Sequence, residues 1–342
     1  MKKFFFSPED CHRNLINKIK PELKFNKNSN INVWKRKLRT VFLKLIGDFP
    51  ERSFLNIRLQ KKIKRKDFIE IHYVFSSEPF SDIPVVLLLP LKKKRPPVVI
   101  CLQGHNTGMH ISFGKIKYKG DEEQIKTNRD YALQAVKMGF ASLSVEQRCF
   151  GIRQDMRDGK KKPYKGCHHA TMNALLIGRT MIGERVWDVI RSIDFLEKID
   201  LTDNSRILIT GDSGGGIISY YAAAVDKRIS AVMPVCGFAG YALSICEVEH
   251  CEDNYIPSAW KYFDMPDIAG LIVPRPLLIV TGRYDNYFPL KSVLEGMKRI
   301  KEIYKAFGEE NRCALVIGNK GHQFYPELAW DAIRRLWPCG FI

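Results

Sequence analysis

A serine surrounded by glycines is the residue of this sequence best suited to chemistry. Gly211-Asp212-Ser213-Gly214-Gly215 fits the pattern Gly-x-Ser-x-Gly, in which a sharp turn between a strand and a helix exposes the serine hydroxyl as a nucleophile. Residues two positions from such a serine must be small, because larger side chains would clash within the turn. A turn of this composition can also bind phosphate or simply pack tightly, so catalysis requires partner residues elsewhere in the chain.

Two unrelated designs place a catalytic serine among such residues. In chymotrypsin-like proteases the serine comes last, after the histidine and the aspartate, in a chain of β-hairpins. Here an apolar stretch at residues 206–210 precedes Ser213, a helix of small residues follows it, and more than a third of the chain lies downstream. This context favours an elbow in an α/β sheet, where the acid and then the histidine follow the serine.

A catalytic serine needs a base, and the base needs an acid that orients it. Asp285 follows a predicted strand at residues 276–281, and His322 follows a predicted strand at residues 313–317. No other histidine lies after His250 in the sequence. We therefore predict Asp285 as the acid and His322 as the base, although an aspartate in this position can also cap the following helix.

An oxyanion hole requires N–H groups that point at the charge developing on the substrate. The amide of Gly214, which follows the nucleophile, is one predicted donor. The loop after the predicted strand at residues 97–102 should supply the other. Its first candidate is the backbone N–H of His105, and Asn106 is the next.

Polar side chains in the longer loops are candidates for substrate contact. They are Gln103, His110, Arg148, His250, Asn254 and Tyr255. For Arg148 a network with Glu184 and Arg185 that fastens the loops is favoured over substrate contact. Residues 167–169 and 250–253 mix histidine, cysteine and acidic side chains, but their spacing matches no zinc site, so we expect no metal.

Short apolar runs and helical patterns alternate along the chain, which indicates an α/β fold with a mostly parallel, twisted sheet covered by helices on both faces. The N-terminal strands should form an antiparallel edge, because short turns join them. Strands are predicted at residues 55–63, 67–75, 83–89, 97–102, 141–146, 206–210, 230–235, 276–281 and 313–317. Helices are predicted at residues 11–20, 33–46, 128–138, 179–198, 214–224, 290–306 and 326–337.

The chain of 342 residues is expected to hold a basic helical arm at residues 1–54 and a catalytic domain at residues 55–342. Loop insertions are predicted at residues 103–127, 148–178 and 237–273, beyond the carboxyl ends of the strands, where ligands bind in such sheets.

Charge and cysteine usage narrow the setting in which the protein works. Residues 1–66 carry a net charge of +14 out of the total of +18, so the basic excess lies away from Ser213. Solvated lysines explain this excess better than nucleic-acid binding, since no nucleic-acid-binding motif accompanies it. Nine scattered cysteines without a C-x-x-C pair, together with the absence of an apolar leader or a membrane-spanning run, predict a reducing, cytoplasmic location.

The sequence resembles the acetyl xylan esterase-like and dienelactone hydrolase-like branch of the α/β hydrolases, from about Trp34 to Trp337. The likeness is carried by residues 102–110, 146–151, 179–188, 211–216, 253–257 and 269–278. It implies an α/β-hydrolase fold and a serine esterase that needs no cofactor, with Ser213, Asp285 and His322 as its triad. Two departures are Gln103-Gly104 where many α/β hydrolases have His-Gly, and Cys149 where glycine is common.

The combined prediction is a serine carboxylic-ester hydrolase that works through an acyl-enzyme and removes a short acyl group, such as acetyl, from a small or carbohydrate-type alcohol. A thioesterase, a lactonase or dienelactone-type hydrolase, or a small-peptide hydrolase could use the same three residues. A catalytically silent basic binding protein on a hydrolase frame is the alternative from another class. The expected partner is a small-molecule ester, and the sequence leaves the oligomeric state open.

Overall fold

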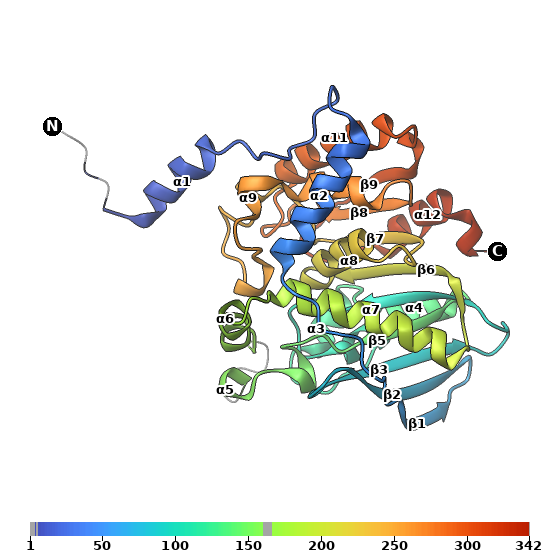
Figure 1. The fold of residues 1–342 in the computed structure, drawn as a ribbon. Coiled ribbons are helices and arrows are strands. Elements are labelled where there is room, and N and C mark those ends of the chain that lie inside the picture. The colour runs from blue at the N-terminus through green and yellow to red at the C-terminus, as the bar shows by residue number, and fades with distance from the viewer. Residues whose placement is uncertain (1–3, 5, 160–165, 342) are drawn as a thin grey trace.

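A sheet of nine strands forms the centre of the computed structural model, which describes residues 4, 6–159 and 166–341. The strand order is β1-β2-β3-β5-β4-β6-β7-β8-β9 (Figure 1). Among the described residues these strands are β1 Arg58–Lys64, β2 Phe68–Glu78, β3 Ser81–Pro90, β4 Pro97–Leu102, β5 Ala141–Val145, β6 Asp203–Asp212, β7 Ala231–Val235, β8 Leu277–Gly282 and β9 Cys313–Gly318. Each of the nine predicted strands is therefore present.

The pairing of the strands divides the sheet into an antiparallel edge and a parallel remainder. β1, β2, β3 and β5 pair antiparallel in that order, whereas β5, β4, β6, β7, β8 and β9 pair parallel. This confirms the predicted fold class. The parallel strands are nearly continuous apolar runs because helices cover both of their faces.

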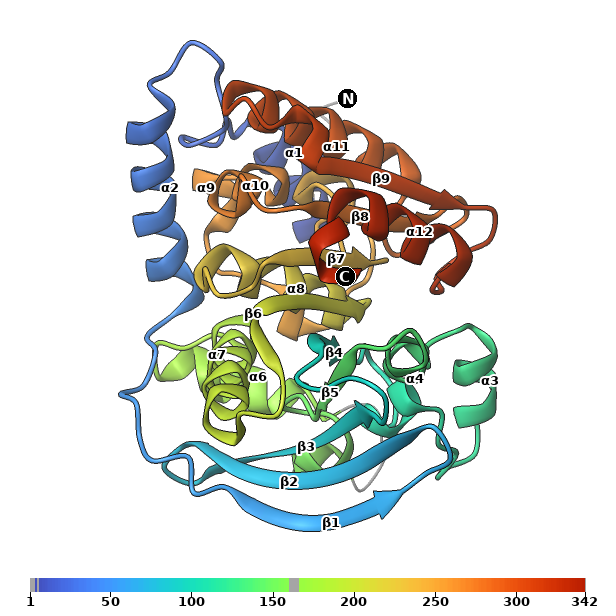
Figure 2. The same ribbon diagram turned by 90° about the vertical axis from the view of Figure 1, so that its right-hand side faces the viewer.

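Neighbouring residues of β4 show how the two faces are filled. Val98 and Ile100 join the larger hydrophobic cluster, whereas Val99 and Cys101 join a second cluster on the opposite face. The larger cluster contains side chains of α2 (Ile31–Ile46), α7 (Met181–Ile199), α8 (Gly214–Val225), α10 (Ala269–Ile272) and α11 (Leu290–Ala306). The second contains those of α4 (Tyr131–Lys137) and α12 (Pro326–Leu336). Figure 2 shows these two sets of helices on opposite sides of the sheet.

The helices agree with the predicted pattern outside the insertions. Those of the described residues are α1 Pro8–Lys18, α2 Ile31–Ile46, α3 Asp121–Lys126, α4 Tyr131–Lys137, α5 Met156–Gly159, α6 His168–Leu176, α7 Met181–Ile199, α8 Gly214–Val225, α9 Ala259–Tyr262, α10 Ala269–Ile272, α11 Leu290–Ala306 and α12 Pro326–Leu336. No helix within the described ranges is both long enough and apolar enough to cross a bilayer.

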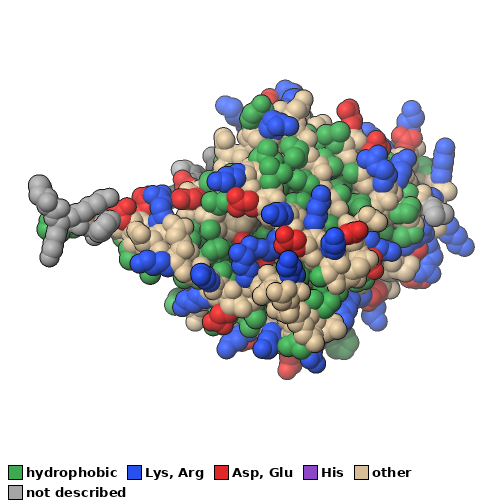
Figure 3. Space-filling view, turned by 90° about the horizontal axis from the view of Figure 1, so that it is seen from above, with side chains coloured by type: hydrophobic (Ala, Val, Ile, Leu, Met, Phe, Trp, Pro, Cys, Tyr) green, Lys and Arg blue, Asp and Glu red, His purple; other side chains and the backbone are tan. Residues whose placement is uncertain are grey.

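The N-terminal arm contacts the rest of the molecule mainly through α2. Trp34, Leu38 and Phe42 of this helix are buried in the larger cluster, and the ring of Trp34 lies against Gly270 so closely that a β-carbon there would overlap it. Helix α1 extends away from the body of the molecule in Figure 1. In Figure 3 lysine and arginine side chains stand among acidic and apolar ones over the visible face.

The predicted loop insertions contain short helices that the sequence pattern did not reveal. Helix α3 and the 3-10 helix Met109–Phe113 lie in the first insertion, α5 and α6 in the second, and α9 and α10 in the third. Residues 160–165 of the second insertion, together with residues 1–3, 5 and 342, lie outside the described residues. These helices are short, so no long apolar period marks them in the sequence.

Candidate active site

Ser213 occupies the strained turn that its sequence pattern predicts. It lies between β6 and α8 with φ 55° and ψ −121°, a left-handed conformation that costs energy for a residue with a β-carbon. The flanking glycines are required by space, since a β-carbon on Gly211 would lie 2.5 Å from the backbone of Gly215. A β-carbon on Gly215 would overlap the carbonyl oxygen of Leu102. Local packing therefore holds the serine at the exposed tip of the turn.

Asp285 and His322 meet at the ends of the neighbouring strands β8 and β9. The Nδ1 atom of His322 lies 2.9 Å from Oδ2 of Asp285. The other oxygen of Asp285 accepts hydrogen bonds from the amides of Tyr287 and Phe288 at 2.9 and 3.1 Å, so the aspartate also holds its own turn. Burial alone would raise the pKa of Asp285, but the bonds from His322 and the two amides outweigh it and lower that pKa.

The rings of Tyr287 and Phe288 flank the imidazole of His322. Their centroids lie 5.1 and 6.1 Å from that of the histidine. The side chain of His322 keeps 17% of its surface exposed, whereas that of Asp285 keeps none. The aspartate carboxylate is thus shielded from water while the far edge of the imidazole remains accessible, which suits proton transfer to and from a bound molecule.

The loop after β4 lies directly against the nucleophile. A β-carbon on Gly104 would lie 2.7 Å from the carbonyl oxygen of Asp212 and 2.9 Å from the β-carbon of Ser213. Only glycine lets the backbone of this loop, which continues into His105, come so close. Gly214 begins α8, and the first amides of a helix have no partner within the helix.

The side chain of His105 forms part of a buried group of charges. Its ring lies beside Gly214, and its Nε2 atom is 3.1 Å from Oδ2 of Asp253. Burial opposes a charge on this imidazole, but the attraction and hydrogen bond of Asp253 outweigh it and raise the pKa of His105 to about 10. Arg185 also contacts Asp253, at 2.8 Å, with side-chain exposures of 1% and 0%. The sequence did not predict this pairing of His105 with Asp253.

Ser213 and His322 line one cavity of about 440 Å³. Its other lining residues are His105, Asn106, Gln124, Arg129, Asp212, Glu249, His250, Cys251, Asn254, Tyr287 and Phe288. The volume lies in the range of sites for small organic ligands. The lining brings together parts of the first and third insertions and the turns after β6, β8 and β9.

Arg129 joins the turn of Ser213 to the loop of His322, a role that sequence analysis missed. Its Nε atom donates to Oδ2 of Asp212 at 2.5 Å, and its Nη2 atom donates to the carbonyl oxygen of His322 at 2.9 Å. The planar guanidinium can hold both acceptors at once because its donors form a rigid fork. An arginine at the start of a predicted helix carries no pattern that reveals such a bridge.

The predicted substrate-contact residues occupy different surroundings. His250 and Asn254 line the cavity with the candidate oxyanion residues His105 and Asn106. Gln103 donates to Glu146 at 2.6 Å. The remaining three also have protein partners: His110 lies 2.8 Å from Asp121, Tyr255 donates to the carbonyl oxygen of Ile245, and Arg148 is bound by carboxylates.

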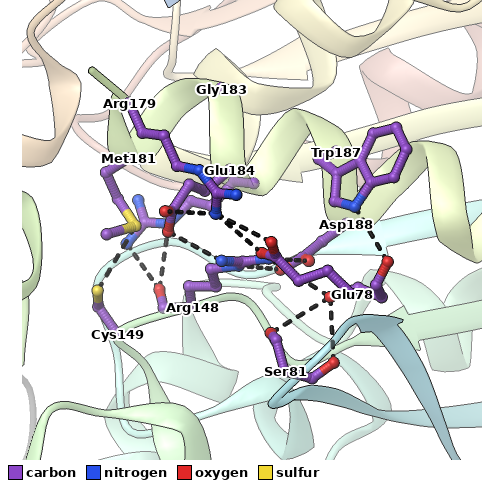
Figure 4. Close-up of polar contacts among 12 residues, drawn as sticks. Glu78, Ser81, Arg148, Cys149, Arg179, Met181, Gly183, Glu184, Trp187 and Asp188 are labelled. Carbon is purple, nitrogen blue, oxygen red and sulfur yellow. Dashed lines mark hydrogen bonds and ion pairs between the residues drawn. The ribbon is translucent and has the colours of Figure 1, made fainter. Parts of the chain in front are cut away.

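Arg148 lies at the centre of a buried ionic network (Figure 4). Its guanidinium contacts Glu78 at 2.7 Å, Glu184 at 2.9 Å and Asp188 at 3.0 Å. Arg179 adds a contact of 2.9 Å to Glu78. The network connects β2, the second insertion and α7, as expected for residues that fasten loops. Arg185 lies apart from these acids, since it pairs with Asp253.

The fold and the site together define an α/β hydrolase: a mostly parallel sheet with a serine at an elbow and an Asp–His pair on later strand ends. A model of the Abhydrolase family matches residues 2–234 and 246–308, and the chain belongs to this family. This confirms the resemblance to α/β hydrolases that the sequence motifs indicate.

Individual known proteins resemble this chain at low sequence identity. YtaP, a proposed hydrolase of Bacillus subtilis (strain 168), is 23% identical over 302 residues, which cover 87% of this chain and 97% of YtaP. A proposed acetyl xylan esterase from Bacteroides fragilis NCTC 9343 has a TM-score of 0.76 at 16% identity, covering 97% of this chain and 90% of its own. A glucuronoyl esterase from Solibacter usitatus has a TM-score of 0.68 at 16% identity, covering 95% and 99%. At such low identity the structural likeness concerns the fold.

Proposed function

We propose that the protein is a serine carboxylic-ester hydrolase with Ser213, Asp285 and His322 as its catalytic residues. The observation that carries this proposal is that Ser213 at its elbow lines one cavity together with His322, whose imidazole is paired with Asp285. The names of the structural neighbours, an acetyl xylan esterase and a glucuronoyl esterase, support ester hydrolysis among the reactions open to this family.

The reaction proceeds in two halves through an acyl-enzyme. His322 takes the proton of the Ser213 hydroxyl as its oxygen attacks the ester carbonyl, and the amides of Gly214 and His105 hold the resulting oxyanion. When the tetrahedral intermediate collapses, the C–O bond to the alcohol breaks and the alcohol leaves with the proton from His322. Water then attacks the acyl-enzyme in the same way and releases the acid. Asp285 remains ionised and stabilises the imidazolium throughout.

The substrate class follows from the size and polarity of the cavity. About 440 Å³ suits a small ester, and the histidine, asparagine and aromatic lining offers hydrogen bonds and stacking surfaces for a polyhydroxylated alcohol. The proposed substrate is therefore a short acyl ester, acetyl first, of a small or carbohydrate-type alcohol. Asn106 and Asn254 are the proposed contacts for its hydroxyl groups.

Ser213→Ala tests the reaction class. Hydrolysis of p-nitrophenyl acetate should fall at least about 1,000-fold in kcat/KM, because the nucleophile is lost while the binding groups remain. Ser219→Ala, on the helix α8 that follows Ser213, is the matched control. The hydroxyl of Ser219 donates to the carbonyl oxygen of Gly215. The rate of the Ser219→Ala variant should stay within a few-fold of that of the wild type. Equal rates for wild type and Ser213→Ala, or fluorophosphonate labelling that survives this substitution, would overturn the proposal.

A substrate panel tests the finer assignment. The p-nitrophenyl ester of acetate should be cleaved faster than those of butyrate and octanoate. Acetylated monosaccharides should release acetate. A higher kcat/KM for a matched thioester, lactone or peptide would replace the ester assignment with one of those activities. The cytoplasmic location remains a prediction, and fractionation of the source cells measures it directly.

A further inference from the structure

A cluster of metal-binding side chains lies beside the cavity but plays no part in the proposed reaction. His105, Cys167, Cys251 and Asp253 each offer one ligand atom, and these four atoms all lie within 4.8 Å of one another. They come from the loop after β4, the start of α6 and the segment before the 3-10 helix at residues 252–254. The sequence spacing could not reveal this group, because the four residues belong to all three insertions.

The chemistry of this donor set suits a thiophilic divalent cation. Two cysteine sulfurs, one imidazole nitrogen and one carboxylate oxygen are ligands that zinc accepts in tetrahedral sites. The ligand atoms of such a site lie roughly 3.3–3.8 Å apart, so shifts of about 1 Å would close the cluster around an ion. A third buried thiol, Cys149, packs in the same hydrophobic cluster as Cys167, so the surroundings of the site are rich in sulfur.

An unpaired polar atom within the cluster indicates that the protein side chains do not complete it. The side chain of Asp253 is fully buried, yet its Oδ1 atom has no hydrogen-bond partner among the described residues. An unpaired buried carboxylate oxygen costs roughly 1–3 kcal/mol or more, and a metal ion would remove this cost. Oδ2 is already used, since it contacts both His105 and Arg185.

The charges of a filled site would balance. Thiolates at Cys167 and Cys251 and the carboxylate of Asp253 supply three negative charges. A divalent cation and the buried guanidinium of Arg185 supply three positive charges. Arg185 is in place for this role, because its Nη2 atom lies 2.8 Å from Asp253 and 3.9 Å from the sulfur of Cys167. Neutrality matters here because isolated charge in a buried region is costly.

We propose that His105, Cys167, Cys251 and Asp253 form a binding site for a thiophilic divalent cation of the zinc class. Four protein ligands leave no open position for water or substrate, so the site is structural and ties the three insertions together next to Ser213. Binding displaces the protons of both thiols and of His105. His105 and Cys251 line the cavity, which gives the ion an entry path.

Metal analysis and cobalt spectroscopy of the full chain test the proposal. Protein purified with reductant and without chelator should carry about one equivalent of zinc, as measured by inductively coupled plasma mass spectrometry. After the metal is stripped, Co²⁺ should bind with a thiolate-to-cobalt charge-transfer absorption and tetrahedral visible bands. Zinc should raise the Tm of the stripped protein by several degrees.

Two variants and a control assign the ligands. Cys167→Ser and Cys251→Ser should each weaken Co²⁺ binding at least about tenfold and reduce the charge-transfer band. Cys246→Ser removes an exposed cysteine from the same insertion as Cys251 and should keep both. Wild-type protein that is fully reduced yet gives no charge-transfer band with Co²⁺ would overturn the proposal, whatever the variants do. So would an unchanged band in both ligand variants, or a Cys167–Cys251 disulfide in protein isolated with reductant.

Discussion

Two regions above the carboxyl ends of the strands hold their side chains in different ways. The triad region, with Asp285 and His322, consists of the short turns that follow the paired strands β8 and β9. The insertion region consists of the long segments at residues 103–127, 148–178 and 237–273, which carry Arg148 and the cluster of His105, Cys167, Cys251 and Asp253. In the first region the sheet positions the chemistry, and in the second the side chains must fasten the loops themselves.

Strand register explains the order of the triad region. Gly282 of β8 pairs with Gly318 of β9, so Asp285 and His322 lie three and four residues beyond one level of the sheet. Because the two strands end side by side, the two side chains meet at 2.9 Å with little help from other loops. The insertion region has no such reference: His105 and Asp253, 148 residues apart in sequence, meet only because the loops that carry them are folded together.

The largest effect is expected from a substitution within the triad region, Asp285→Asn. In Asp285→Asn the amide oxygen can still accept from the amides of Tyr287 and Phe288, so the turn should persist. The charge opposite His322 is lost and the wrong imidazole tautomer is favoured. We expect kcat to fall roughly 1,000- to 10,000-fold with little change in thermal stability. Steady-state kinetics with p-nitrophenyl acetate measures this, and a decrease of less than tenfold would contradict the assigned acid.

The next effect concerns the stability of the insertion region. Arg148→Met leaves the buried carboxylates of Glu78, Glu184 and Asp188 short of a partner, which should lower the free energy of unfolding by about 3–5 kcal/mol. Denaturant unfolding measures the loss, and kcat below the melting range should remain within a few-fold of wild type.

A surface ion pair provides the control for that measurement. Arg312→Met removes an exposed partner of Glu309 and should cost less than about 1 kcal/mol. Equal losses in the two variants would show that the Arg148 network does not fasten the loops. A kcat that collapses in Arg148→Met while the protein stays folded would place this residue in catalysis instead.

Glu146 offers a pH-dependent test of how the first insertion is held. Its carboxylate accepts from Gln103 at 2.6 Å and from the amide of Met109 at 2.8 Å, and burial raises its pKa to about 7. The folded state therefore retains a proton that the unfolded chain releases at about 4.5. The stability that this group contributes is present below about pH 4.5 and is lost as the pH rises to about 7, by up to about 3 kcal/mol.

Glu146→Gln should remove this dependence, because the amide resembles the protonated acid. Urea unfolding of both proteins should give similar free energies at pH 5, and the variant should be the more stable at pH 8. A difference between the two proteins that stays constant with pH would mean that Glu146 is ionised in the folded state throughout this range.

The same difference between the two regions explains which strands and site residues the sequence could predict. Apolar runs of five or more residues identified β4, β7, β8 and β9, because a strand covered on both faces leaves a continuous pattern. Asp285 and His322 could be predicted as candidates because they follow such runs. The pairing of β3 with β5 rather than β4, and the meeting of Cys167 with Cys251, depend on contacts that no local pattern encodes.

Arg129 tests whether the triad region is as self-sufficient as its strand register suggests. Its guanidinium connects Asp212, next to the nucleophile, with the carbonyl oxygen of His322. Arg129→Lys keeps the charge but has only one nitrogen, which cannot hold both acceptors in the same geometry. We expect kcat to fall about tenfold through misplacement of His322 relative to Ser213, with KM nearly unchanged.

The split between kcat and KM distinguishes positioning from substrate binding in that variant. Arg129 also lines the cavity, so a residue that binds substrate directly would raise KM on substitution. Arg129→Met, which loses the charge as well, should lower kcat further than Arg129→Lys. An unchanged kcat in both variants would mean that the strand ends alone hold the base, and that the triad region needs no cross-loop fastening of the kind that Arg148 provides.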